Sequence, residues 1–249
     1  MDLFYEIHGE GQPLVMLHGG GTDMRDWTLL APLLSRHFKV VTVDARGCGK
    51  SPAPTEPSNY IEDVLSLLNH LNIEQVTLVG NSIGGQIATE FSLSYPERVQ
   101  NLILLSPALS GFVHSTDLIE VLQRVQAAVP DVVKMTELTL ASPFYTISNK
   151  SPQRGLMVEM TEHNIKKMFE WATPKSIWPK PPAIERLDQL QVRTLFILGT
   201  HDFADCFRIA DHFRAVPNIH FVEIQGGDHK INLTHSEEVY KNIVTFLEA

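Results

Sequence analysis

Short apolar runs recur along the chain, and stretches of helical character separate them. The runs are too short for helices and end at polar residues or glycines, which is typical of buried strands. They are Leu14–Leu17, Lys39–Val43, Val76–Val79, Leu102–Leu105, Thr194–Leu198 and Ile219–Ile224. We expect helices at residues 60–71, 84–95, 204–215 and 235–248. Strands alternating with helices predict an α/β fold, in which helices flank both faces of a mostly parallel sheet.

The alternation stops between about residues 111 and 185. This segment has no comparable apolar run, shows helix-period positions such as Leu118 and Val121, and is rich in methionine and aromatic residues. We expect a helical cap, or lid, inserted after the strand that ends near residue 105. The predicted core comprises residues 1–110 and 186–249, and the predicted cap residues 111–185. A separate helical subdomain without a role at the site is the alternative.

Composition narrows the class of protein. A length of 249 residues suits one α/β domain with an insertion, or at most two small domains. The net charge of −9 and the scattered lysines and arginines exclude the basic face that a nucleic-acid partner requires. No apolar run predicts a membrane span, and the first residues lack the pattern of a signal peptide. Because Cys48 and Cys206 make neither a disulfide framework nor a zinc cluster, we expect a cytoplasmic protein without metal. We also expect a monomer or homodimer.

The segment Gly80–Gly84 carries the pattern G-x-S-x-G with Ser82 at its centre. It follows a predicted strand and opens a predicted helix, which is the setting of a nucleophile elbow. Small neighbours are needed there because bulky side chains clash in so tight a turn. The context therefore predicts Ser82 as a nucleophile rather than as part of a plain glycine-rich turn.

A second glycine-rich loop, His18–Gly21, follows the strand at Leu14–Leu17. Backbone N–H groups in such a loop can face the negative charge that develops on a carbonyl oxygen during attack. We predict that Gly20 and Ile83, the residue after the nucleophile, supply the N–H groups of this oxyanion hole. A plain tight turn is the alternative.

Two further strand ends carry an acid and a histidine. Asp202 follows the strand at Thr194–Leu198, and His229 follows the last strand. A serine hydroxyl needs an imidazole base, and the imidazole needs a carboxylate that fixes its tautomer. The order Ser82, Asp202, His229 is the one expected for a hydrolase built on such a sheet. Asp205 and Asp228 are rival carboxylates, and we favour Asp202 over both.

Beyond the triad, three segments resemble the α/β-hydrolase superfamily, and the resemblance covers essentially the whole chain. Asp44–Ser51 matches its D-x-R-G-x-G-x-S loop, and Tyr95–Val99 matches its Y-P-E-R-V segment. His229–Val239 is similar to its H-x-x-x-x-E-x-P-E-E-V ending, with Thr234 in place of the acid and Ser236 in place of the proline. These two departures affect the entry to the last helix more than the chemistry.

The expected activity is that of a serine hydrolase that cleaves a small ester or lactone through an acyl-enzyme, as a carboxylesterase does. It needs no cofactor. The predicted cap suggests a small-molecule substrate with an apolar part, which Phe144, Met168 and Trp171 would contact. The resemblance leaves two alternatives open. One is a carbon–carbon bond hydrolase or a lyase on the same triad, and the other is a ligand receptor that turns over very slowly.

Overall fold

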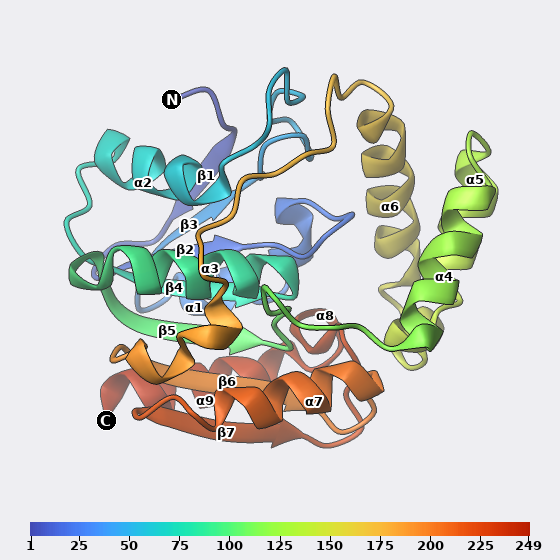
Figure 1. Ribbon diagram of the computed structural model, residues 1–249. Helices are drawn as coiled ribbons and strands as arrows, with labels where there is room; N and C mark the ends of the chain where they lie inside the picture. The colour runs from blue at the N-terminus through green and yellow to red at the C-terminus, as the bar shows by residue number, and fades with distance from the viewer.

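The computed structural model describes residues 1–249 and contains one seven-stranded sheet (Figure 1). The strand order is β1-β3-β2-β4-β5-β6-β7. β1 runs antiparallel to β3, and every other neighbouring pair is parallel. The strands are β1 (Tyr5–His8), β2 (Pro13–Leu17), β3 (Lys39–Val43), β4 (Val76–Asn81), β5 (Val99–Leu105), β6 (Arg193–Gly199) and β7 (Ile219–Ile224). The predicted mostly parallel sheet flanked by helices is confirmed.

Helices cover both faces of the sheet. α2, α3 and α7 pack on one face, and α1 and α9 pack on the other. The helices are α1 (Ala31–Leu34), α2 (Tyr60–His70), α3 (Ile83–Ser94), α4 (Thr116–Ala127), α5 (Val132–Leu140), α6 (Arg154–Met168), α7 (Ala204–Phe213), α8 (Ile231–Thr234) and α9 (Ser236–Glu248). None of them is both long and apolar enough to cross a membrane.

The sequence of β2 shows why both faces are covered. Val15 and Leu17 belong to the cluster under α2, α3 and α7, whereas Leu14 and Met16 belong to the cluster under α1 and α9. Successive strand side chains point to opposite faces, so a strand that is apolar at every position needs partners on both sides. The continuous apolar runs of the sequence follow from this requirement.

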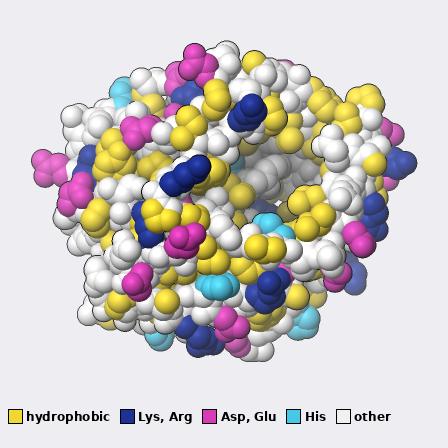
Figure 2. Space-filling model, in the orientation of Figure 1, with side chains coloured by type: hydrophobic (Ala, Val, Ile, Leu, Met, Phe, Trp, Pro, Cys, Tyr) yellow, Lys and Arg dark blue, Asp and Glu magenta, His cyan; other side chains and the backbone are white.

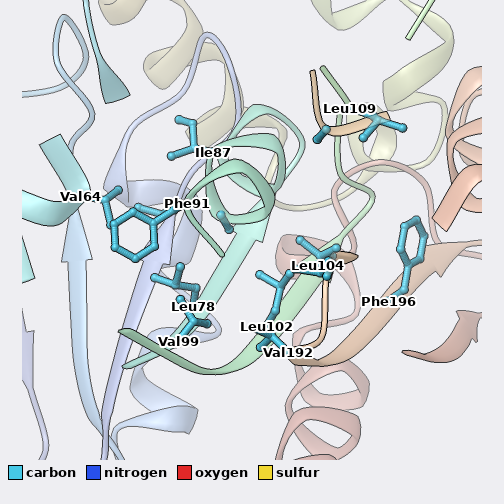
Figure 3. Packing of buried hydrophobic residues seen from close by; sticks show 14 of the residues in the cluster. Val64, Leu78, Ile87, Phe91, Val99, Leu102, Leu104, Leu109, Val192 and Phe196 are labelled. Atoms are coloured by element: carbon cyan, nitrogen blue, oxygen red, sulfur yellow. The ribbon is translucent and has the colours of Figure 1, made fainter. Parts of the chain in front are cut away.

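The cluster in Figure 3 fixes α3 on the sheet. Ile87 and Phe91 of α3 lie beside Val64 of α2 and Leu78 of β4. Phe91 is fully buried, and burial of such a side chain stabilises a fold by about 1.5–3 kcal/mol. The first residue of α3 is Ile83, so this packing also holds the turn that precedes the helix.

No strand lies between the end of β5 at Leu105 and the start of β6 at Arg193. Residues 111–185, called the insertion below, contain α4, α5 and α6, which stand together beside the core in Figure 1. Asn164 of α6 ties the insertion to the core, because its amide donates to Asp23 (2.9 Å) and its oxygen accepts from the Gly49 N–H (2.9 Å).

Candidate active site

The turn between β4 and α3 presents Ser82. Its backbone has φ 53° and ψ −119°, so a residue with a side chain occupies the left-handed region. Two neighbouring segments hold it there: the Ser82 N–H donates to the Leu105 oxygen (3.1 Å), and the Ala108 N–H donates to the Ser82 oxygen (2.8 Å). The strained strand–turn–helix geometry is that of a nucleophile elbow.

The glycines around Ser82 are required by close backbone contacts. A Cβ on Gly80 would lie 2.4 Å from the Gly84 carbonyl oxygen, and a Cβ on Gly84 would lie 2.0 Å from the Leu17 carbonyl oxygen. Real Cβ atoms do not approach other atoms so closely. The glycines of the G-x-S-x-G pattern thus allow the elbow to close against β2.

The loops after β6 and β7 bring Asp202 and His229 together. The Nδ1 atom of His229 lies 3.0 Å from Oδ1 and 3.3 Å from Oδ2 of Asp202, and both residues are buried. Burial opposes ionisation of Asp202, but the charge of His229 and its hydrogen bond lower the pKa of this carboxyl below its usual value. An ionised Asp202 holds the proton of His229 on Nδ1, which leaves Nε2 as an acceptor.

The rival carboxylates face other partners. Asp205 accepts from the Ser115 N–H (2.8 Å) and pairs with Arg208 (2.9 Å). Asp228 is buried and accepts three hydrogen bonds from the insertion, from the Ile147 N–H (2.8 Å), the Ser148 N–H (2.7 Å) and the Ser148 hydroxyl (2.9 Å). The two carboxylates therefore anchor the insertion, Asp205 at its start and Asp228 at its centre.

Asn81 connects the elbow with the His229 loop. Its side-chain amide donates to the Leu105 oxygen (2.9 Å) and, at the longer distance of 3.5 Å, to the His229 carbonyl oxygen. The Ser82 hydroxyl itself makes no hydrogen bond to His229 in this structure. Such contacts are often long without substrate and tighten when it binds.

His18 belongs to the framework of the His18–Gly21 loop. Its Nδ1 donates to the Gly19 oxygen (2.8 Å), and its Nε2 accepts from the Ala45 N–H (3.0 Å). Because both ring nitrogens are engaged and the side chain is buried, His18 orders the loop and is not available as a base.

The two predicted oxyanion residues lie side by side. A Cβ on Gly20 would be 3.4 Å from Cγ1 of Ile83, and a Cβ on the preceding Gly19 would be 3.5 Å from Cβ of Ser82. The structure therefore places the His18–Gly21 loop against the elbow, as an oxyanion hole requires.

A buried ion pair lies behind this loop, and the sequence analysis missed it. The Nζ atom of Lys230 lies 2.9 and 2.7 Å from the two carboxylate oxygens of Asp26, and it also donates to Oδ1 of Asn81 (3.2 Å). Burial opposes the charge on Asp26, but Lys230 lowers the pKa of its carboxyl. The only signal in the sequence is a basic residue, Lys230, directly after His229.

Of the three insertion side chains predicted to contact substrate, Phe144 reaches the site. Its ring centroid lies 4.6 Å from that of His229, and the His229 N–H donates to the Phe144 carbonyl oxygen (3.2 Å). The neighbouring Tyr145 ring lies 6.5 Å from His229, and burial raises the pKa of its hydroxyl. Figure 2 shows the molecule hollowed between α3 and α6, with hydrophobic side chains along the rim.

The structure does not bring Met168 and Trp171 to this site. Met168 is the last residue of α6 and is 44% exposed. The indole N–H of Trp171 donates to the Gly47 oxygen (3.0 Å), and its ring packs on Gly47. The prediction rests on residue type, and residue type does not tell which side of a segment faces the core.

Comparisons with known proteins identify the family to which this fold belongs. A family model described as the alpha/beta hydrolase fold matches residues 12–236, and the chain belongs to this family. A 2-hydroxymuconate semialdehyde hydrolase of Pseudomonas sp. (strain CF600) is 37% identical over 111 residues, which are 42% of this chain and 39% of that protein. A 2-hydroxy-6-oxo-6-phenylhexa-2,4-dienoate hydrolase of Comamonas testosteroni is 27% identical over 80% of this chain and 74% of its own length.

Among solved structures, a thermophilic esterase from Thermogutta terrifontis superposes with a TM-score of 0.83. It is 22% identical, and the match covers 99% of this chain and 93% of the esterase. This likeness shows a shared fold over nearly the whole of both chains.

Proposed function

We propose that the protein is a serine hydrolase that cleaves a small ester or lactone. Ser82 is the nucleophile, His229 the general base, and Asp202 the residue that orients His229. The observation that carries the proposal is the pairing of a strained Ser82 at the elbow with a buried Asp202–His229 hydrogen bond in loops at the same edge of the sheet. Each of these groups is needed for acyl transfer by serine.

The mechanism has two steps. Ser82 Oγ attacks the carbonyl carbon while its proton passes to Nε2 of His229, and the alcohol then leaves with that proton. Water attacks the acyl-enzyme by the reverse proton path and releases the acid. The Gly20 and Ile83 N–H groups receive the negative oxygen in both steps, and loss of one such donor typically costs about 3 kcal/mol. No metal or cofactor takes part.

The insertion acts in this proposal as a cap over the site. Three contacts support this role: the Phe144 ring against His229, the bond from the His229 N–H to Phe144, and the hydrogen bonds from Ile147 and Ser148 to Asp228. Because Phe144 presents an apolar ring beside the base, the acyl or alcohol part of the substrate is expected to be apolar.

A carbon–carbon bond hydrolase is the second candidate. The names of the two curated relatives favour it, since both describe hydrolases of unsaturated keto or semialdehyde acids. The same Ser82, His229 and Asp202 would serve there, and the leaving group would be a carbon instead of an alcohol oxygen.

The test compares ester and carbon–carbon substrates on the wild-type protein and on Ser82→Ala. With p-nitrophenyl acetate and butyrate, the wild type is expected to turn over repeatedly, whereas Ser82→Ala loses several orders of magnitude in rate but keeps its fold. Faster cleavage of a 2-hydroxy-6-oxo-dienoate than of any ester would select the second candidate. A burst of one equivalent followed by arrest would indicate a receptor, and more than a tenth of wild-type turnover in Ser82→Ala would refute the nucleophile.

A further inference from the structure

Cys206 lies next to the Asp202–His229 pair. It occupies the first turn of α7, and its Sγ is 3.6 Å from Nδ1 of His229. One ligand atom each of Asp202, Cys206 and His229 lies within 4.8 Å of the others, and all three residues are buried. The proposed reaction uses Asp202 and His229 but gives the thiol no part.

The spacing of these atoms suits a tetrahedral metal ion. Zinc binds thiolate at about 2.3 Å, imidazole nitrogen at about 2.0–2.1 Å and carboxylate oxygen at about 2.0–2.2 Å. Tetrahedral angles then require about 3.6 Å between sulfur and nitrogen and about 3.4 Å between nitrogen and oxygen. The structure has 3.6 Å for the first pair and 3.0 and 3.3 Å for the second. The sulfur–nitrogen and nitrogen–oxygen distances thus lie within a few tenths of an ångström of those in a three-ligand site, and the sulfur and the carboxylate oxygen lie within 4.8 Å of each other.

We propose that Asp202, Cys206 and His229 form an inhibitory site for a thiophilic divalent cation of the zinc class. Sulfur, nitrogen and oxygen donors together favour Zn²⁺ or Cd²⁺ over the hard ions Mg²⁺ and Ca²⁺. A solvent molecule completes the tetrahedron. The cation is an inhibitor here and has no role as a cofactor.

Binding stops catalysis through the tautomer of His229. The Cys206 thiol releases one proton to solvent when its sulfur binds the cation, and the imidazole proton moves from Nδ1 to Nε2. Nε2 then carries hydrogen and cannot accept the Ser82 proton, while Asp202 is engaged by the metal. The inhibition rests on the proposed function, whereas the binding itself does not.

The experiment separates binding from inhibition and uses Cd²⁺ as the probe. Titration of the full chain should develop the ultraviolet Cd–thiolate charge-transfer band, which saturates at one Cd²⁺ per chain. Cys206→Ala and the near-isosteric Cys206→Ser should lose the band. Cys48→Ala should keep it, because Cys48 is the only other cysteine and lies in the Asp44–Ser51 loop. A band that survives in both Cys206 variants, or vanishes in Cys48→Ala, would refute the site.

Inhibition is measured in the same three variants. Saturating Zn²⁺ should abolish turnover of a p-nitrophenyl ester in the wild type and in Cys48→Ala, and EDTA should restore it, while the Cys206 variants stay active. Full activity of the wild type with the Cd–thiolate band saturated would overturn the inhibitory role. Absence of esterase activity in all variants, with the band intact, would count against the proposed function and not against the metal site.

Discussion

Removal of either partner of the buried Asp26–Lys230 ion pair is expected to be one of the most destabilising single changes at the site. Its side chains are 0% and 3% exposed, with a shortest N–O distance of 2.7 Å. Removal of one partner from such a pair leaves a buried charge uncompensated and typically costs about 3–5 kcal/mol. We therefore expect Asp26→Asn and Lys230→Met each to lower the free energy of unfolding by about 3–5 kcal/mol. For a chain of this size, the midpoint of thermal unfolding would fall by about 6–20 °C.

The assay is a double-mutant cycle by urea unfolding. The double variant Asp26→Asn/Lys230→Met leaves neither charge of the pair in the interior. Its free energy of unfolding should therefore fall by clearly less than the sum of the decreases in the two single variants. The matched control is the pair Asp211–Arg214, whose side chains are 72% and 69% exposed at 3.2 Å. An exposed pair of this kind contributes about 0–1 kcal/mol. If each single variant at Asp26 and Lys230 lowered the free energy of unfolding by less than about 1 kcal/mol, as at the control pair, the reasoning would be refuted.

The pH dependence gives an independent check. In the wild type, Lys230 lowers the pKa of Asp26, so this stabilisation is present above the unfolded pKa of about 3.9 and is lost as pH falls. In Lys230→Met the buried carboxyl loses this cation, which raises the pKa of Asp26 relative to the wild type, although the Thr22 hydroxyl (3.2 Å) still donates to it. The variant therefore keeps less of this stabilisation as pH rises. Both effects make the difference in the free energy of unfolding between wild type and Lys230→Met larger at pH 8 than at pH 4.5. The opposite trend would contradict an ion pair between Asp26 and Lys230.

Three further changes test the site. Asp202→Asn should leave the protein folded but lower kcat by about 10⁴-fold, because His229 is no longer held with its proton on Nδ1; a loss of less than tenfold would exclude Asp202 as the orienting residue. Asp228→Asn should speed proteolysis within the insertion, since the carboxylate accepts three hydrogen bonds from it, and unchanged cleavage would show that the anchor is dispensable. Phe144→Ala should weaken binding of long acyl esters by about 0.8 kcal/mol per methylene no longer buried and leave binding of acetate esters unchanged. Replacement of the exposed Met168 by alanine is the control. Equal changes for long-chain and acetate esters would refute a contact between Phe144 and the acyl chain.

The parts of the structure that sequence predicts well are those fixed by neighbours in the chain. An apolar run such as Leu14–Leu17 predicts that the run is buried. The glycines around Ser82 predict a close approach between backbone segments. Asp202 and His229 are predicted for a similar reason, since each lies in the loop that follows a strand. Parallel strands end at one edge of the sheet, so residues at their ends meet whatever the rest of the chain does.

The sequence does not predict contacts between segments that lie far apart along the chain. Asp26 and Lys230 are 204 positions apart, and neither lies in a pattern that requires the other. The residue type of Asp228 makes it a rival acid in the sequence, whereas its partners lie 80 and 81 positions earlier in the insertion. The residue type of Met168 predicts a substrate contact, although its place at the end of α6 leaves it 44% exposed.

Three consecutive residues after β7 join the separate parts of the site. Asp228 binds the insertion, His229 binds Asp202, and Lys230 binds Asp26 behind the His18–Gly21 loop. The backbone N–H of His229 is itself bonded to the insertion through Phe144. A movement of the insertion that breaks this bond must therefore change the restraints on the His229 side chain, because Asp228 and His229 are adjacent in the chain. Closure over a substrate and alignment of His229 are consequently expected to occur together, so variants that loosen the insertion should lower kcat as well as raise KM.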